Sequence, residues 1–338
     1  MSTADGVVDR FIGVSDEAIL TLLDNMIWPI LALVIVGVFV FVPQTFTDIN
    51  SVRLILWAAG PIALLVLAES LCLLSGHFDL SIGSVAGFSA MVTGMVLGQC
   101  PSCWGLTGNA WVGFGLIFLI GATIGLLNGV MIAKLGLNPF LQTLAFLIIF
   151  EGAKTALNTQ PVSGLPQQYT AIGGTPSIAI GIMVVAFVAF GIMMRYSRFG
   201  QSVYALGSDK DSALEVGIKT DRVVIIVYTI SGILAAMAGL LQTGFVGIVP
   251  PLIGEGLVFQ AFAGAIIGGI SLFGGRGKVT GALGGVLLIQ VVQSALNNST
   301  VIQAEQIQLI NGIVLLVAIL LYSLQASIRS RILASGAQ

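Results

Sequence analysis

Long apolar runs separated by short polar stretches fill most of the chain. Ten such runs can be counted, at 27–43, 54–74, 80–98, 111–133, 140–157, 176–194, 223–245, 256–273, 279–296 and 307–324. A helix of roughly 20 mostly apolar residues crosses the hydrocarbon core of a bilayer. The pattern therefore predicts an all-α, polytopic membrane protein with about ten transmembrane helices. Several runs contain Gly, Pro or a polar residue, so we expect some broken helices, buried where neighbours satisfy the freed backbone groups.

The basic residues of the polar connections predict the orientation of the chain in the membrane. When the runs are threaded with the amino terminus in the cytoplasm, all of the 13 Lys and Arg residues except Arg53 and Lys154 fall on the cytoplasmic side. Short loops rich in Lys and Arg mark the cytoplasmic face of membrane proteins. We therefore expect both termini to be cytoplasmic.

The domain organisation follows from the same pattern. Residues 1–26 alternate apolar and acidic positions at helical spacing, and their acidic start is unlike a cleavable signal peptide. We expect this segment to form an amphipathic helix on the cytoplasmic side, resting on the membrane lipid or on the bundle. Residues 27–325 form the transmembrane domain, which includes the long cytoplasmic loop 195–222, and residues 326–338 form a cytoplasmic tail.

Composition excludes other classes of protein. Apolar residues make up 57% of the 338 positions and charged residues only 8%, whereas soluble domains carry about 25% charged residues. An ordinary soluble domain and a disordered chain are both excluded. Several of the 43 glycines recur at a spacing of four residues, on one face of a helix. Small residues at this spacing let helix backbones approach closely in a bilayer. The glycines concerned are Gly121, Gly125 and Gly129, then Gly264 with Gly268, then Gly277, Gly281 and Gly285.

Polar residues inside the apolar runs are candidates for structure or transport. Glu69 has no local partner, so a structural and a functional role are equally open, while Glu151 and Lys154 are spaced to form an ion pair. Neutral hydrogen-bonding groups could join helices or line the path of a polyhydroxylated solute; they are Asn128, Gln142, Gln260, Gln290, Gln293 and Asn311.

Cysteine and histidine chemistry is sparse. Cys100 and Cys103 lie in an outer loop, where a local disulfide or two free thiols are both open, and Cys72 lies inside a run. His77 is the sole histidine, so neither a histidine metal cluster nor a catalytic triad is expected. The run Gly274–Val279 lacks the hydroxyl that follows the lysine in a phosphate-binding loop. We expect no catalytic residue, metal site or nucleic-acid partner in this chain.

The loop 195–222 is the largest polar connection. Ser208 with Asp211 three residues later is typical of a helix start, and Gly217 of a helix stop. The sequence therefore predicts a short helix over 208–218 on the cytoplasmic face, with Ala213, Leu214 and Val216 available for contact.

Three segments together resemble a known family. They are Gly76–Ser84 (GHFDLSIGS), the stretch from Ala205 through Ile218 to Tyr228–Gly232 (YTISG), and Gly268–Gly281 (GGISLFGGRGKVTG). In this order, with Asn138–Leu144 (NPFLQTL), they are similar to the permease subunits of ribose/xylose/arabinose-type ABC sugar importers, over about residues 50–325. His77 departs from the pattern, because the family usually has a second glycine there.

The resemblance implies a machine of several chains in a prokaryotic cytoplasmic (inner) membrane. Two permeases, identical or different, would form the path for a sugar delivered by an extracytoplasmic binding protein. ATP and Mg²⁺ would act on a partner ATPase, and this chain would bind no cofactor. The predicted 208–218 helix would couple to the ATPase through Ser208, Asp209, Asp211, Ala213, Leu214, Glu215, Gly217 and Ile218. Candidates for the path or for motif roles are Glu69, Asp79, Ser81, Asn128, Phe140, Thr143, Gly274, Gly275 and Gly277.

Other readings remain open from the sequence. The same architecture could import nucleosides, branched-chain amino acids or a furanose signalling molecule. A stand-alone secondary transporter would instead need an ion-coupling group, for which Glu69 is the one candidate. A purely structural scaffold would not explain the coupling-type loop.

Overall fold

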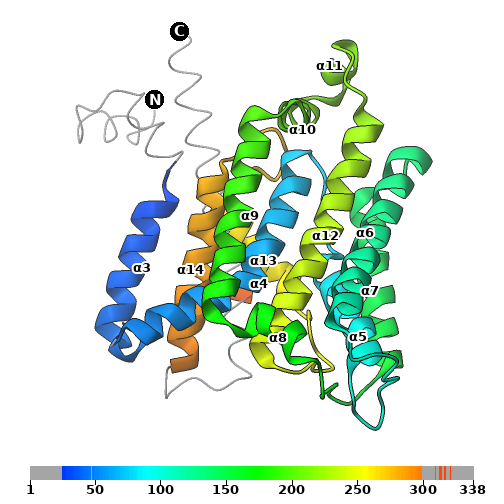
Figure 1. Ribbon diagram of the computed structural model, residues 1–338. Helices are drawn as coiled ribbons and strands as arrows, with labels where there is room; N and C mark the ends of the chain where they lie inside the picture. The colour runs from blue at the N-terminus through cyan, green and yellow to red at the C-terminus, as the bar shows by residue number, and fades with distance from the viewer. Residues whose placement is uncertain are drawn as a thin grey trace.

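The computed structural model describes residues 25–46, 48–298 and the single positions 309, 312, 313, 316 and 320. The predicted amphipathic segment 1–26, the tenth apolar run at 307–324 and the tail 326–338 lie almost entirely outside the described residues. The described part is an upright bundle with two short helices at one end (Figure 1). Its helices are α3 (Ile27–Phe41), η1 (Pro43–Phe46), α4 (Ile49–Leu74), α5 (Ile82–Leu97), α6 (Ala110–Leu135), α7 (Pro139–Leu157), α8 (Gln167–Gly174), α9 (Pro176–Tyr196), α10 (Arg198–Ser208), α11 (Lys210–Glu215), α12 (Thr220–Val246), α13 (Leu257–Ile267) and α14 (Val279–Asn298).

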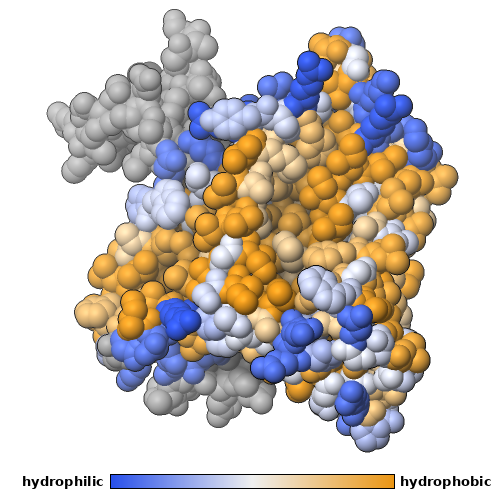
Figure 2. All heavy atoms as spheres, viewed as in Figure 1, coloured by the Kyte–Doolittle hydropathy of each residue, from blue (hydrophilic) through white to orange (hydrophobic). Residues whose placement is uncertain are grey.

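The long helices have the length and composition of membrane spans. Six helices of the described residues qualify, namely α4, α6, α7, α9, α12 and α14, whereas α3, α5 and α13 are apolar but shorter. On the face seen in Figure 2, apolar residues cover the middle of the molecule and hydrophilic residues gather at its two ends. The all-α prediction is confirmed for the described residues, whose one β-type pairing is the isolated bridge between Val162 and Val249.

Helix α4 is the central helix of the bundle. Every residue from Ala59 to Leu74 is buried, and α4 packs against α9, α12, α13 and α14. A helix that is apolar on all sides is buried on all sides. Glu69 lies on this central helix and is fully buried.

Glycine seams hold neighbouring helices together, as predicted. On α6, a Cβ at Gly121 would stand 2.4 Å from a backbone oxygen of α12, and a Cβ at Gly125 would stand 2.3 Å from another. Helices α6 and α12 therefore touch backbone to backbone. The same holds between α13 and α14, where a Cβ at Gly285 would stand 1.9 Å from the carbonyl oxygen of Gly264. Small residues give membrane helices this close approach.

The structure differs from the predicted helices in three places. The run 256–273 is not a full span, because α13 ends at Ile267 and the chain then turns through several glycines with positive φ. Helix α11 lies within the predicted helix 208–218 and is shorter than it, whereas α10, which ends at Ser208, was not predicted. Helix α8 was not predicted, since its eight residues between two longer elements carry no apolar run.

The predicted ion pair of α7 is confirmed and does more than neutralise charge. Lys154 Nζ lies 2.6 Å from Glu151 and also donates to the carbonyl oxygen of Ile253, at 2.9 Å. Ile253 belongs to the loop between α12 and α13, whose Gly254 packs against the backbone of Gly83 and Gly87 on α5. The buried lysine therefore fastens this loop to α7 and α5.

The loop between α5 and α6 is closed by a disulfide between Cys100 and Cys103, so the disulfide alternative is the one the structure has. Asn158 donates from Nδ2 to Ser102 Oγ in this loop, at 3.0 Å. Cys72 is free and buried in α4.

Candidate functional site

Helix α11 projects from the end of the bundle and offers two exposed apolar side chains. Leu214 is 48% exposed and Val216 is 76% exposed, whereas Ala213 is only 2% exposed and faces the bundle. Of the residues predicted to be available for contact, two are therefore accessible and Ala213 is not. Among the described helices, Figure 1 shows α11 at the far end of the bundle, next to α10.

The start of α11 differs from the prediction. Ser208 ends α10 and donates back to the carbonyl oxygen of Tyr204, so it does not cap the next helix. The N-cap is Asp209, whose carboxylate accepts from the backbone N–H of Ser212 at 2.6 Å. This bond lowers the pKa of the exposed Asp209 carboxyl, because it stabilises the charged form.

The end of α11 agrees with the prediction. Gly217 has φ of +84°, and its N–H donates to the carbonyl oxygen of Leu214. The N–H of Ile218 donates to the carbonyl oxygen of Ala213. A left-handed glycine with such bonds is a common helix stop. Asp211 lies in the first turn of α11, and Glu215 is its last residue.

Below α11, the three motif segments meet at one point, which we call the glycine junction: Gly76, Gly207, Gly274 and Gly275. A Cβ at Gly207 would stand 2.0 Å from the carbonyl oxygen of Leu74 and 2.6 Å from the nitrogen of Gly275. A Cβ at Gly274 would stand 2.4 Å from the Gly207 oxygen and 2.9 Å from the Gly76 Cα. The end of α4, the end of α10 and the loop after α13 therefore touch backbone to backbone, with no room for a side chain.

Hydrogen bonds hold this junction closed. The N–H of Gly275 donates to the carbonyl oxygen of Leu74 at 3.0 Å. This bond joins the loop after α13 to the last residue of α4. The hydroxyl of Tyr204 on α10 donates to the carbonyl oxygen of Gly277 at 3.0 Å. Partial burial raises the pKa of this Tyr204 hydroxyl, so it remains a donor at neutral pH. A displacement of α10 must therefore be passed to α4 and to the loop after α13.

A polar cluster of Asp79, Ser81, Asn128 and Ser231 lies next to the junction along the chain. Asp79 Oδ1 accepts from the backbone N–H and the hydroxyl of Ser81, at 3.0 Å and 2.5 Å. Asp79 Oδ2 accepts from the hydroxyl of Ser231 on α12, at 2.9 Å. Asn128 on α6 donates to Ser81 Oγ at 3.0 Å. The cluster therefore ties the start of α5 to both α6 and α12.

The polar cluster lies well inside the bundle. Asn128 is seven residues before the end of α6, which corresponds to about 10 Å at 1.5 Å per residue. All four residues of the cluster are buried. The segment 75–81 thus descends from the end of α4 into the bundle, and the hydroxyl of Tyr228 supports it by donating to the carbonyl oxygen of Phe78 at 2.6 Å.

Glu69 adds unpaired acceptors near this cluster. The backbone of Asp79 lies beside the Glu69 carboxyl, yet neither carboxyl oxygen has a well-formed hydrogen bond. Asn128 Oδ1 is likewise buried without a partner. Buried acceptors without a well-formed hydrogen bond therefore gather in this part of the bundle, which is uncommon for buried groups.

Some of the candidate residues predicted from the sequence lie together in the structure, and others do not. Glu69, Asp79, Ser81 and Asn128 gather in one region, and Gly274 and Gly275 lie at the junction, with Gly277 beside it. Phe140 and Thr143 do not join them. Phe140 is exposed on the first turn of α7, where Asn138 is the N-cap, and the Thr143 hydroxyl donates to the carbonyl oxygen of Pro139.

The residues missed as site candidates are Gly207, Tyr228 and Ser231. All three stand in the segments that carry the family resemblance, and the two hydroxyls interrupt an apolar run. That interruption was the available signal for Tyr228 and Ser231. The role of Gly207 depends on contacts between segments far apart in the sequence, which no local pattern reveals.

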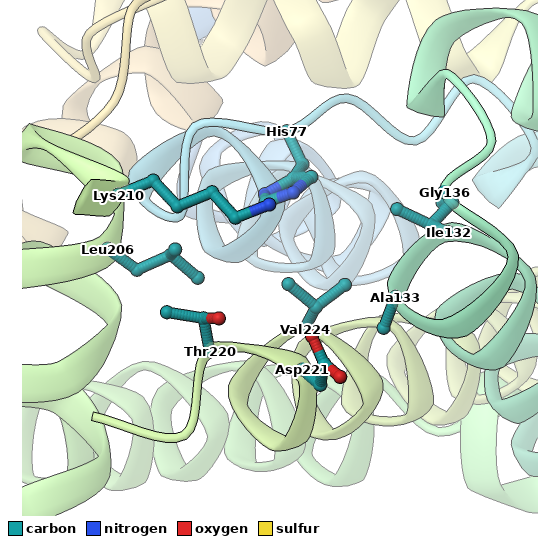
Figure 3. A pocket seen from close by; sticks show the side chains of 9 residues that line it. All are labelled: His77, Ile132, Ala133, Gly136, Leu206, Lys210, Thr220, Asp221 and Val224. Atoms are coloured by element: carbon teal, nitrogen blue, oxygen red, sulfur yellow. The ribbon is translucent and has the colours of Figure 1, made fainter. Parts of the chain in front are cut away.

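A cavity of about 90 Å³ opens between the segment 75–81 and α11. Figure 3 shows the His77 ring and the Lys210 side chain pointing toward each other across it. The cavity is lined by His77, Ile132, Ala133, Gly136, Leu206, Lys210, Thr220, Asp221 and Val224. Among the described residues, no group of His, Cys, Asp and Glu side chains could hold a metal ion.

Comparison with known proteins identifies the family. A family model described as "branched-chain amino acid transport system / permease component" matches residues 50–320. The ribose import permease protein RbsC of Bacillus subtilis is 34% identical over 305 residues, which cover 87% of this chain and 91% of that protein. The D-allose transport system permease protein AlsC of Escherichia coli K12 is 30% identical, covering 81% of this chain and 83% of that protein.

A third relative is named for a different cargo. The autoinducer 2 import system permease protein LsrC of Yersinia enterocolitica is 31% identical, covering 75% of this chain and 68% of that protein. No solved structure matches the chain. The family match and the relatives agree with the resemblance stated from the sequence. The chain therefore belongs to this family of transport-system permease components, as a multi-pass inner-membrane transport subunit and not an enzyme.

Proposed function

We propose that this chain forms the translocation path of an ABC importer for a sugar, which an external binding protein delivers. A partner ATPase that binds ATP and Mg²⁺ drives the cycle, and this chain binds neither. The observation that carries the proposal is α11, a short capped helix whose exposed Leu214 and Val216 project beyond the apolar middle of the molecule. Exposed apolar side chains on a rigid helix suit docking into a partner's groove.

The route of coupling runs from α11 through the glycine junction to the polar cluster. Closure of the ATPase around α11 would displace α10, which contacts the end of α4 and the loop after α13 without intervening side chains. Packed backbones transmit such a displacement because they have little compressible space between them. The segment 75–81, with Asp79 and Ser81, would then move relative to α6 and α12.

The cargo is inferred from the relatives. Relatives named for ribose and D-allose import match more than four fifths of this chain, so a pentose or hexose is the favoured class. The name of the matching family model and the autoinducer 2 relative keep a branched-chain amino acid and a small furanose as outcomes of the test.

We further propose a dimer of permeases, with about ten spans each and both termini in the cytoplasm. In this orientation α10 and α11 face the cytoplasm, together with the basic residues at their end of the bundle. These include Lys134, Arg195, Arg198, Lys210, Lys219, Arg222, Arg276 and Lys278.

The proposal is tested by ATP hydrolysis in liposomes that hold this chain and its ATPase. We expect the binding protein loaded with ribose or D-allose to stimulate hydrolysis, and the empty binding protein to stimulate it less. Stimulation by leucine alone would move the cargo to the amino-acid class. Hydrolysis that ignores the binding protein in every state would contradict the importer function.

The double variant Leu214→Asp with Val216→Asp should lose its ATPase partner. Both side chains are exposed, so the bundle should keep its thermal stability while two buried charges at the interface oppose docking. Co-purification of the ATPase should fall at least about tenfold, which corresponds to roughly 1.4 kcal/mol. Gln201→Asp, which places a charge on the exposed side of α10, is the matched control. Normal co-purification of the double variant would remove α11 as the docking helix.

Labelling of thiols tests the proposed orientation. In intact cells, an impermeant maleimide should modify Cys100 and Cys103 only after mild reduction, while buried Cys72 stays unmodified. In a Cys100→Ser, Cys103→Ser background, Val216→Cys should be labelled only after the membrane is opened. Labelling of that thiol in intact cells would reverse the orientation.

A further inference from the structure

His77 is the sole histidine of the chain and occupies a position where the resembling family has glycine. The backbone does not require glycine there, since only Gly76 in this turn has a positive φ. The imidazole packs edge-to-face against Tyr228, with ring centres 6.2 Å apart, and lines the cavity below α11. It is two residues from Asp79, so the ring stands between the docking helix and the polar cluster.

Hydrogen bonds assign the tautomer of the ring. His77 Nδ1 lies 2.8 Å from the carbonyl oxygen of Ser75, which can only accept, so Nδ1 carries the proton. The Ser75 hydroxyl donates to the carbonyl oxygen of Cys72 and is thus an acceptor toward Nδ1 as well. In the neutral ring the lone pair is therefore on Nε2, which is free to accept from a cation.

Lys210 at the start of α11 is the cation that faces this ring. Its side chain extends across the cavity toward His77 (Figure 3). Its charge acts on both His77 and Asp221. Asp221 is itself paired with Lys134 of α6, at 2.8 Å. Lys210 is therefore the charged group of α11 that faces the turn carrying His77.

We propose that His77 and Lys210 form a strut that sets the position of α11 relative to the segment 75–81, and that protonation of His77 releases it. His77 is in this sense a positioning residue for coupling, not a residue that touches the cargo. When the partner presses α11 toward the bundle, the Lys210 ammonium donates to Nε2, and the cavity supplies the room. This inference rests on the proposed docking role of α11.

The groups around the ring determine the direction of the pH effect. Lys210 faces the ring from α11, Asp221 and Tyr228 from α12, and Lys134 from α6 beside Asp221; Leu206 is the lining residue of α10. Asp79 follows on the ring's own segment, next to Glu69 of α4. Burial and the Lys210 charge lower the pKa of His77, and the bond to Ser75 offsets part of this.

The lowered pKa of His77 determines how the stability of the closed strut depends on pH. The imidazole is neutral at pH 7.5 and can accept from Lys210, whereas an unfolded or exposed histidine binds its proton near pH 6.5. The state with the strut closed is therefore fully stable above about pH 6.5 and loses stability as the pH falls below it. A charged ring would then face the Lys210 ammonium across the cavity, and the two would repel.

Nitrogen NMR of histidine-labelled protein in nanodiscs tests the strut without any transport assay. Because His77 is the sole histidine, its signal needs no assignment once the purification tag is removed. We expect the Nδ1–H tautomer at pH 7.5 and a midpoint below about 6.5. Lys210→Met should raise the midpoint, since a nearby positive charge disfavours the imidazolium. Lys219→Met, which changes an exposed lysine that does not line the cavity, is the matched control. An equal midpoint in all three proteins would overturn the proposal.

Transport in the complete complex gives the second readout. The ratio of cargo transported per ATP at pH 5.5 to that at pH 7.5 should be well below one in the wild type. In His77→Gln, which keeps a polar side chain but does not titrate, this ratio should return toward one. An unchanged ratio would refute the strut while leaving the importer function intact. Failure of the wild-type complex to hydrolyse ATP in response to loaded binding protein would instead refute the proposed function, and the NMR result would be unaffected.

Discussion

Gly207→Val should abolish ATP-driven transport and lower the thermal stability of the protein. A Cβ at this position would stand 2.0 Å from the Leu74 carbonyl oxygen and 2.6 Å from the Gly275 nitrogen. Both are backbone atoms that cannot rotate away, so α10 must separate from α4. The hydrogen bond between Gly275 and Leu74 would be lost with this separation. We expect uptake below a tenth of the wild-type rate, measured in liposomes, and a lower Tm of the purified protein.

Gly181→Ala is the matched control for this variant. Gly181 lies within α9, and a Cβ there would meet nothing within 4 Å. Its replacement by alanine should leave Tm unchanged or slightly raised, because alanine is the better helix former. Gly207→Ala separates the two effects of the larger substitution: it should fold in part and show reduced transport per ATP. Wild-type Tm and wild-type uptake in both Gly207 variants would show that the junction does not need backbone contact.

Asp79→Ala is expected to have the second largest effect. The Asp79 carboxylate accepts three hydrogen bonds, two from Ser81 and one from Ser231. A hydrogen bond to a charged group contributes roughly 1.5–3 kcal/mol, so their combined loss should cost several kcal/mol. Helix α5 would lose its tie to α12, and we expect a lower Tm and uptake reduced at least tenfold.

Asp79→Asn and Ser231→Ala separate charge from packing at the same site. Asparagine can still accept from Ser81 and can donate to the Ser231 hydroxyl, so Asp79→Asn should be more stable than Asp79→Ala. Ser231→Ala removes one of the three bonds and should have the smallest effect on Tm. If Asp79→Ala were as stable and as active as Ser231→Ala, the polar cluster would not hold the 75–81 segment in place.

The extent of the membrane helices could largely be predicted from the sequence. The runs at 111–133 and 140–157 correspond to α6 and α7 within a few residues. This agreement is expected, because a membrane-spanning helix is defined mainly by one long apolar stretch. The Lys154–Glu151 pair and the glycine seam at Gly121 and Gly125 were also predictable, since both depend on helical spacing alone.

The arrangement of the site could not be predicted in the same way. Ser208 was predicted to start the coupling helix, yet the neighbouring Asp209 is the cap, and both residue types suit that role. The short α13 was hidden in the run 256–273, because hydropathy does not show where a chain turns inside a bundle. The bond from Ser231 to Asp79 joins residues 152 positions apart, and the glycine junction joins segments still farther apart in the chain. Such contacts follow from packing, and no local pattern contains them.

ATP-dependent uptake of ribose or D-allose into liposomes tests the central claim most directly. The liposomes would hold this chain and its partner ATPase, with the binding protein on the side opposite α11. We predict uptake that requires ATP, the ATPase and the binding protein together, and that is lost in the Leu214→Asp, Val216→Asp double variant although its bundle remains folded. Uptake by this chain alone, or full uptake by the double variant, would contradict the account.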